Sequence, residues 1–189
     1  MQFRSLGKSN IEVSALGLGC WAIGGPYCHN GNANGWGKVD DNESILGIHR
    51  AIDNGVNFFD TADIYGCGHS EKILAKAIQG KRDQMIIGTK FGITFDELNL
   101  SVTGECDESE YIRKACEASL SRLDTDYIDL YQFHLGHSDN GKIVQKVLED
   151  LVLEGKIRSY GWSTDSPERA KIFSEGPHCV SIQQKLNLL

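Results

Sequence analysis

The chain lacks the features that mark membrane, secreted or nucleic-acid-binding proteins. No stretch approaches the roughly 18 consecutive apolar residues that a membrane-spanning helix needs. The opening residues 1–8 (MQFRSLGK) lack the apolar core of a signal peptide, which predicts a cytoplasmic protein. Acidic residues outnumber basic ones, 26 to 19, and the net charge of −7 disfavours nucleic acid or an anionic membrane surface as a partner.

Cysteines with the spacing of a redox or zinc site are also missing. The six cysteines are scattered along the chain, and no CxxC motif occurs. Cys28–His29 and Cys67–Gly68–His69 do not have the spacing of a structural zinc site, so we expect no metal. In a cytoplasmic chain, free thiols in loops and in the core are the expected state.

The sequence shows no linker, no low-complexity segment and no other sign of a second domain. Its 189 residues are enough for one domain with a sizeable core. Hydrophobic and charged contents of 40% and 24% are typical of a globular protein. We therefore expect a single domain over residues 1–189.

Apolar runs of strand length alternate with amphipathic helical patterns along most of the chain. Each helical pattern carries apolar residues three or four apart, as at Ile45, Ile48 and Ile52. Asp40 and Asp41 are predicted to start the first helix, Ser70 to cap the second and Ser109 to open the third. The expected strands are 15–19, 56–60, 85–90, 127–134, 157–163 and 180–183. Two further helices are expected: one carries apolar residues between Val144 and Leu151 and ends at Gly155, and the other starts at Ser166.

Six strand–helix units in series predict parallel strands joined by right-handed crossovers. Strand ends recur every roughly 20 to 45 residues, close to the spacing in a (β/α)8 barrel. The expected fold is therefore α/β, of the TIM-barrel type but incomplete, with about six of the eight strand–helix units. Residues 2–6 and 11–14 predict an N-terminal β-hairpin, and 20–39 and 91–107 predict long loops on the active-site face.

Asp60, Tyr65, Lys90 and His134 lie at or just past the ends of separate apolar runs. In a barrel, the C-terminal ends of the strands meet on the active-site face, which would bring these four side chains together. A lysine beside a tyrosine lowers the pKa of the phenol, which can then donate a proton near neutral pH. An imidazole next to it can orient a carbonyl group.

Taken one at a time, these residues have plainer explanations. A single aspartate or lysine at a strand end is more often a turn residue or part of a surface ion pair. His134 alone could be a core histidine, and Tyr65 an ordinary loop aromatic. The four compatible groups at one end of three consecutive strands favour carbonyl reduction, with Asp60 holding Lys90 charged and in place.

Several segments resemble the signatures of the aldo-keto reductase family, and together they span nearly the whole chain. Residues 59–66 (FDTADIYG) and the Ser70–Glu71 pair resemble its first signature, and residues 89–92 (TKFG) its lysine segment. Residues 123–134 (LDTDYIDLYQFH) resemble its second signature. A third is matched by residues 155–163 (GKIRSYGWS).

The resemblance implies a barrel without a Rossmann domain that uses NADPH to reduce an aldehyde or a ketone, with NADH as the alternative cofactor. It implies that Tyr65 is the general acid, that Lys90 and Asp60 tune it, and that His134 orients the substrate. Ser163 and Gln183 are implied to bind the nicotinamide carboxamide. The full cofactor-binding set that it implies is Trp21, Asp60, Ser163, Thr164, Gln183 and Leu186, and the substrate pocket is Trp21, Tyr65, Phe91 and His134.

Two of these positions depart from the family pattern. Thr164 stands where many members have asparagine, and it can still offer a hydroxyl to the carboxamide. Leu186 stands where many members have an aromatic that stacks under the nicotinamide, so we expect weaker stacking. Tyr27 and Trp36 either line the pocket or serve only in packing.

Family members continue through two further strand–helix units, which carry the phosphate-binding loop. The chain is therefore expected to be the truncated N-terminal three-quarters of a reductase, and to be inactive alone. A six-stranded sheet leaves two open edges, so a barrel completed by self-association is one alternative. A non-catalytic interaction or cofactor-sensing subunit is another. The expected partner is a small-molecule carbonyl compound.

Overall fold

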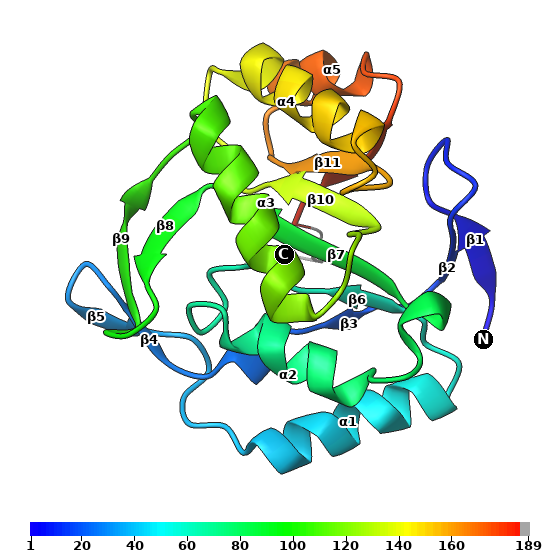
Figure 1. Ribbon diagram of the computed structural model, residues 1–189, viewed down its shortest axis with the longest axis vertical. Helices are drawn as coiled ribbons and strands as arrows, with labels where there is room; N and C mark the ends of the chain where they lie inside the picture. The colour runs from blue at the N-terminus through cyan, green and yellow to red at the C-terminus, as the bar shows by residue number, and fades with distance from the viewer. Residues whose placement is uncertain (186–189) are drawn as a thin grey trace.

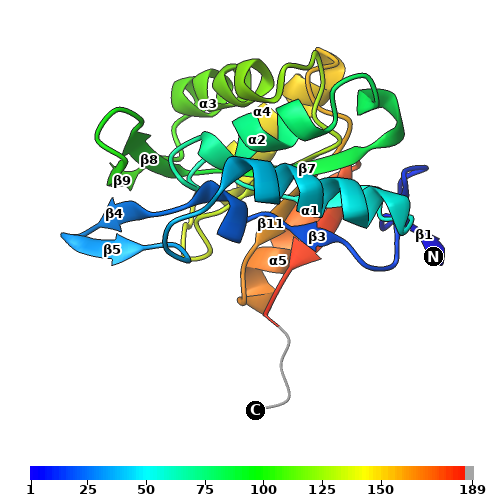
Figure 2. The ribbon, with the colours of Figure 1, turned by 90° about the horizontal axis from the view of Figure 1, so that it is seen from below.

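Figures 1 and 2 show the computed structural model, which describes residues 1–185. The strands are β1 (Phe3–Ser5), β2 (Glu12–Ser14), β3 (Leu18–Gly19), β4 (Tyr27–His29), β5 (Asn32–Asn34), β6 (Phe58–Asp60), β7 (Ile86–Phe91), β8 (Ile93–Asp96), β9 (Ser101–Glu105), β10 (Leu130–Phe133), β11 (Tyr160–Ser163) and β12 (Cys179–Gln183). The helices are α1 (Asp41–Asp53), α2 (His69–Ala77), α3 (Ser109–Leu123), α4 (Gly141–Leu153) and α5 (Pro167–Ser174), with 3-10 turns η1 (Ala22–Gly24) and η2 (Arg82–Gln84). Within residues 1–185, no helix is both long and apolar enough to cross a membrane.

Six strands form one parallel sheet in the order β3-β6-β7-β10-β11-β12. A helix connects each strand to its neighbour, and α1 to α5 follow one another along the outer face of the curled sheet (Figure 1). The sheet is half of a barrel, and β3 and β12 stand at its two ends. The predicted fold, an incomplete (β/α)8-type barrel, is confirmed.

Several strands are shorter than the apolar runs that predicted them. The run 127–134 yields only Leu130–Phe133, and the ladder with β7 begins at Leu130 opposite Gly88. One residue earlier, the backbone N–H of Ile87 donates to the buried Asp129 carboxylate at 3.0 Å. At this point a side-chain hydrogen bond therefore replaces a backbone hydrogen bond between the strands, and a run of apolar residues does not predict this.

The prediction that Ser70 caps α2 is wrong. Helix α2 begins at His69, after Gly68 in the left-handed conformation with φ 93°. Ser70 is buried inside the first turn, where its hydroxyl donates to the Cys20 carbonyl at 2.9 Å and lies 2.9 Å from the Thr61 hydroxyl. The serine joins the helix to two strand ends instead of capping it.

The other predicted helix starts agree with the structure. Asp40 caps α1 by accepting from the backbone N–H groups of Asn42 and Glu43. Ser166 caps α5, with Pro167 at the first helical position, where a missing N–H is harmless. Ser109 is the first residue of α3, as expected.

The hydrophobic core lies between the sheet and its helices. Its largest fully buried side chains include Phe59, Tyr131, Tyr160 and Trp162. The N-terminal hairpin β1–β2 forms as predicted and packs Ile11 and Val13 against Ile86 in a separate small cluster. The hairpin lies at the opposite end of the molecule from β4, β5, β8 and β9 (Figures 1 and 2).

The two long connections predicted as loops form a second sheet. Strands β4 and β5 pair as one hairpin, β8 and β9 as another, and the order is β5-β4-β9-β8. The hairpins meet through Cys28 and Ser101, with the Cys28 N–H donating to the Leu100 carbonyl at 2.7 Å. We call β4, β5, β8 and β9 the cap sheet. Asn30–Gly31, with φ of 52° and 76°, turns the first hairpin, and this Asn-Gly signal was present in the sequence.

We predict that Asp129→Ala destabilises the fold by about 3–5 kcal/mol, because it leaves two guanidinium groups without their anion. The fully buried carboxylate accepts from Arg82 at 2.9 Å and Arg158 at 2.8 Å, besides Ile87. Urea unfolding measures the change. The control is Glu110→Ala, which removes the exposed Glu110–Lys114 pair and should leave the midpoint unchanged. Equal midpoints for both variants would contradict the prediction.

Candidate active site

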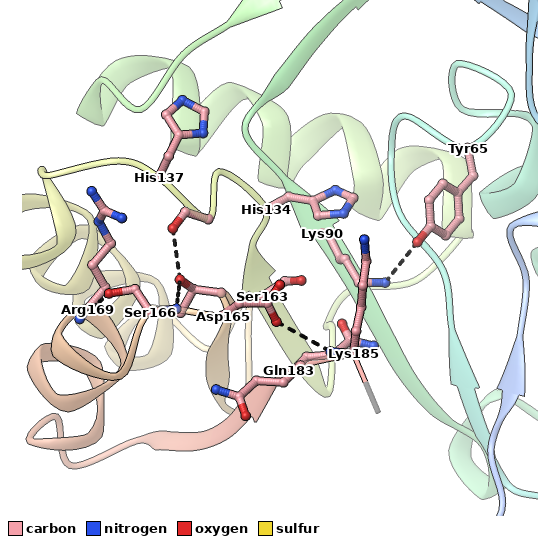
Figure 3. A pocket seen from close by; sticks show the side chains of 13 residues that line it. Tyr65, Lys90, His134, His137, Ser163, Asp165, Ser166, Arg169, Gln183 and Lys185 are labelled. Carbon is pink, nitrogen blue, oxygen red and sulfur yellow. Dashed lines mark hydrogen bonds between the residues drawn. The ribbon is translucent and has the colours of Figure 1, made fainter. Parts of the chain in front are cut away.

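A cavity of about 560 Å³ opens at the C-terminal ends of the strands. Tyr65, Lys90 and His134 point toward one another at one side, and Ser166 and Arg169 line the other side (Figure 3). Ser163 and Gln183 lie between them. The side chains thus come from the loop after β6 and from the ends of β7, β10, β11 and β12, as the barrel prediction required.

The ammonium of Lys90 is the centre of the site. Lys90 is only 1% exposed, and its Nζ donates to Asp60 Oδ1 at 2.8 Å and to the Thr61 carbonyl at 2.8 Å. Its third contact is the Tyr65 hydroxyl at 3.4 Å. A buried ammonium is stable only with such acceptors and a counter-charge, and Asp60 supplies that charge. Asp60, Tyr65 and Lys90 therefore form one contact network.

The backbone of the Tyr65 loop is fixed by a close approach of two glycines. Gly66 has φ 61°, and a Cβ on it would lie 1.8 Å from the Gly24 carbonyl oxygen. A Cβ on Gly24 would in turn lie 2.5 Å from the Tyr65 carbonyl carbon. Only glycine fits at either position, so η1 packs backbone against backbone on the Tyr65 loop.

The cap sheet holds the same loop from the other side. Tyr27 of β4 packs in one cluster with Ala62, Ile64 and Cys67, and Phe95 and Val102 cover this cluster from β8 and β9. Burial of these apolar side chains stabilises the loop conformation that presents Tyr65 to Lys90. Tyr27 therefore serves in packing, the plainer of its two expected roles.

Tyr65 is a protonated phenol at neutral pH. Burial raises its pKa above the ordinary value of 10.0, the Lys90 charge lowers it, and the Asp60 charge raises it. The effect of Lys90 has the predicted sign, but burial outweighs it in this structure. A phenol that keeps its proton beside a cation is arranged as a proton donor.

His134 is a neutral imidazole at the cavity wall. Burial, and then the Lys90 charge, lower its pKa from 6.5 to about 3. Its backbone N–H donates to the Phe91 carbonyl at 2.9 Å, and its ring lies edge-on to Tyr65 with centroids 6.2 Å apart. Its Nδ1 has no hydrogen-bond partner among residues 1–185. A neutral ring carries one N–H, which can donate to a carbonyl oxygen.

The amide of Gln183 is hydrogen-bonded to the Asp60 side of the cavity. Its Nε2 donates to Asp60 Oδ2 at 3.1 Å, and its Oε1 accepts from Gln132 Nε2 at 3.2 Å. Gln132, 1% exposed, was not assigned a role from the sequence. Gln132 lies on β10 two residues before His134, which directly follows the strand, and this spacing in extended chain places both on the same face.

Thr164 does not have a free hydroxyl for a cofactor in this structure. Its side chain is 3% exposed, donates to the Gly136 carbonyl at 2.8 Å and accepts from the Ser166 N–H at 3.2 Å. It therefore fixes the loop after β11. Leu186 lies outside the described residues.

The predicted aromatic residues divide into two groups. Trp21 stacks on Tyr65 with centroids 6.1 Å apart, and the 70% exposed Trp36 lies edge-on against Trp21 at 5.8 Å; both lie beside the cavity lining without being part of it. Phe91, in contrast, is fully buried and stacks on Tyr131 at 4.4 Å, away from the cavity. Side chains alternate along a strand, so Lys90 on the inner face puts Phe91 among the helices.

The far side of the cavity was not predicted from the sequence. Arg169 on α5 pairs with Asp139 at 2.9 Å, and Lys185 follows β12. His137 and Asp165 complete this polar wall. No group of three or more metal-ligating side chains gathers in the described part of the chain.

The sequence matches the model of the "Aldo/keto reductase family" over residues 15–189. The chain belongs to the aldo-keto reductase family. It is 39% identical to "Aldo-keto reductase YhdN" and 35% identical to "Uncharacterized oxidoreductase YqkF", both from Bacillus subtilis (strain 168). The matches cover 100% of this chain but only 54% and 57% of those proteins.

Solved structures of reductases have the same fold. The holo form of aldo-keto reductase AKR11C1 from Bacillus halodurans superposes with a TM-score of 0.86 at 33% identity, covering 100% of this chain and 59% of that one. An aldo-keto reductase from Klebsiella pneumoniae in complex with NADPH superposes with a TM-score of 0.69 at 28% identity, over 89% of this chain and 52% of that one. The chain therefore spans little more than half the length of these relatives.

We predict that the His134 ring does not titrate between pH 5 and 8, because its pKa lies near 3. The neutral ring contributes stability above the ordinary pKa of 6.5, and this contribution is lost as the pH falls toward 3. The ¹³Cε1 signal of His134 in a pH titration, assigned with a His134→Gln variant, measures this. A midpoint near 6.5 would contradict it.

Proposed function

We propose that this site reduces an aldehyde or a ketone to an alcohol, with a nicotinamide cofactor as the hydride donor. The observation that carries the proposal is the buried Lys90, joined to Asp60 and the Tyr65 hydroxyl beside the neutral His134. The chain spans only about half of its relatives' length. That the whole protein carries out this reaction is therefore part of the same proposal.

The residues present fit the nicotinamide end of such a cofactor. A carboxamide needs one hydrogen-bond donor and one acceptor, and the Ser163 hydroxyl and Gln183 amide in the cavity offer both. Bound there, the cofactor would supply the hydride. NADPH is favoured over NADH because the Klebsiella pneumoniae relative was solved with NADPH.

The protein's own groups handle the proton and the carbonyl oxygen. The Tyr65 hydroxyl donates its proton to the oxygen as negative charge develops there. Lys90, 3.4 Å away, stabilises the phenolate that remains, and Asp60 keeps the ammonium in place. The N–H of the neutral His134 ring donates to the same oxygen and orients the carbonyl.

A non-catalytic subunit is the weaker alternative. A buried lysine held against a carboxylate and a phenol is unfavourable to keep without a use, because desolvation of both charges opposes the ion pair. A purely structural scaffold would be as stable with apolar residues of similar size at these positions.

We predict that Tyr65→Phe lowers kcat by at least about 100-fold, because the proton donor is gone. Binding of NADPH, followed by quenching of protein fluorescence, should change little, because the phenyl ring keeps its stack on Trp21. The matched control is Tyr111→Phe, which removes a hydroxyl that contacts Gly92 and Ile93 outside the cavity. Near-parental turnover in Tyr65→Phe would rule out Tyr65 as the acid.

We predict that Lys90→Met lowers kcat by a similar factor, and that the loss is steepest at acidic to neutral pH. Without the ammonium, the pKa of Tyr65 rises further, and the phenolate left by proton transfer loses its stabilising charge. The pH profile of kcat measures this. The exposed Lys146→Met is the control. An unchanged profile would show that Lys90 does not tune Tyr65.

A further inference from the structure

A buried polar cluster lies behind the catalytic pair, between the sheet and its helices. At its centre is Glu71 on the first turn of α2, fully buried although it carries a carboxylate. Its Oε1 accepts from the Thr89 hydroxyl at 2.6 Å, and its Oε2 accepts from Arg122 Nε at 2.6 Å. None of these three side chains lines the cavity.

The Thr89 contact reaches the strand that carries Lys90. Thr89 precedes Lys90 on β7, so its side chain points to the helices while that of Lys90 points to the cavity. The 2.6 Å hydrogen bond that the Thr89 hydroxyl donates to the carboxylate is of the strong, charge-assisted kind. This hydrogen bond fixes the position of β7 relative to the first turn of α2.

The start of α2 is in turn joined to the Tyr65 loop. The backbone N–H of Ser70, the neighbour of Glu71, donates to the Tyr65 carbonyl at 3.1 Å. The Ser70 hydroxyl also donates to the Cys20 carbonyl, just before Trp21. Glu71 and Ser70 thus link the loop that carries Tyr65 to β7 from the outside of the sheet.

Arg122 extends this link to the cap sheet. Its guanidinium lies over the Phe95 ring at 5.7 Å, and its side chain packs on Gly68 at the end of the Tyr65 loop. Glu71 pairs with the Arg122 guanidinium and neutralises its charge. The nearby Asp63 does not do so, because burial and the Glu71 charge raise the pKa of Asp63 well above 3.8 and favour its neutral form.

We propose that Glu71 is a positioning residue, which clamps the Tyr65 loop onto β7 through Thr89 and so sets the distance between the Tyr65 hydroxyl and the Lys90 ammonium. The inference rests on the proposed carbonyl reduction at that pair. The distance, 3.4 Å, is at the outer limit of a hydrogen bond. A displacement of about 1 Å can lower a catalysed rate by about 100-fold.

The test compares Thr89→Val, which removes the hydroxyl donor, with Thr89→Ser, which keeps it. Glu71→Gln is a second disrupting variant, because it removes the negative charge beside Arg122, and only one of its two terminal atoms can accept a hydrogen bond where both Glu71 oxygens accept one. The control is Ser159→Ala, since the buried Ser159 hydroxyl donates to the Asp129 carbonyl at 2.6 Å; these residues directly precede β11 and β10, whereas Tyr65 lies at the C-terminal ends of the strands. It loses a comparable hydrogen bond with no link to the clamp.

The first readout does not need activity. The protein is labelled with ¹³C-tyrosine, and its six tyrosines give separate ring signals. The signal of Tyr65 is the one that disappears in Tyr65→Phe, and it is recorded at neutral pH. The Lys90 Nζ lies 5.1 Å from the centre of the Tyr65 ring and 3.4 Å from its hydroxyl, so the chemical shift of the ring reports the placement of this ammonium. We expect the signal to move in Thr89→Val and Glu71→Gln, to return in Thr89→Ser, and to stay in place in Ser159→Ala.

The second readout is steady-state reduction of an aldehyde with NADPH. We expect Thr89→Val to lower kcat by about tenfold or more with KM nearly unchanged, and Thr89→Ser to recover most of it. An unmoved Tyr65 signal in both Thr89→Val and Glu71→Gln, or equal effects of Ser159→Ala, would overturn the clamp. Absence of reduction in the whole parental protein, of which this chain spans a part, would instead contradict the proposed function, and the tyrosine signal would still decide the clamp.

Discussion

The ammonium of Lys90 has to remain a cation where only 1% of the residue is exposed, and much of the surrounding structure meets that requirement. Asp60 at the tip of β6 provides the charge, and the Thr61 carbonyl provides a further acceptor. With these in place, the ammonium is free to face the Tyr65 hydroxyl. Removing the carboxylate would leave an uncompensated buried charge, which costs about 3–5 kcal/mol.

Two layers around this ion pair hold the phenol at its place. On the cavity side, Gly24 and Gly66 let η1 press against the Tyr65 loop, and the cap sheet covers the loop with apolar side chains. On the helix side, Glu71 and Ser70 connect the loop to β7 and to the end of β3. Asp60 and Lys90 therefore lie on strands, and the loop that carries Tyr65 is held between a packed second sheet and the start of α2.

The sequence predicted the parts of this arrangement that follow from strand order. Parallel strands deliver their last residues to one edge, so Asp60, Lys90 and His134 could be brought together from their positions alone. Phe91 was wrongly assigned to the pocket because its position at a strand end does not tell which face of the sheet its side chain lies on. Alternation along the strand from Lys90 would have placed Phe91 on the helix face. Gln132 could have been found by the same alternation from His134.

Other features depend on contacts that one sequence does not carry. Ser70 has the composition of a helix cap, but the Cys20 carbonyl lies close enough to take its hydroxyl. The two hairpins of the cap sheet, which meet at Cys28 and Ser101, are far apart in the sequence and come together only in the folded chain, so only the Asn30–Gly31 turn was visible locally. The balance of burial and charge at Tyr65 likewise required the three-dimensional environment.

The central claim is that the cavity beside Lys90 receives the nicotinamide of the cofactor. The most direct test is a crystal structure of the protein with NADP⁺. The account predicts density for the ring in the cavity, with its carboxamide on Ser163 and Gln183 and the ring next to the Tyr65 hydroxyl. Density for the cofactor away from these residues, with only solvent next to the Tyr65–Lys90 pair, would contradict the claim.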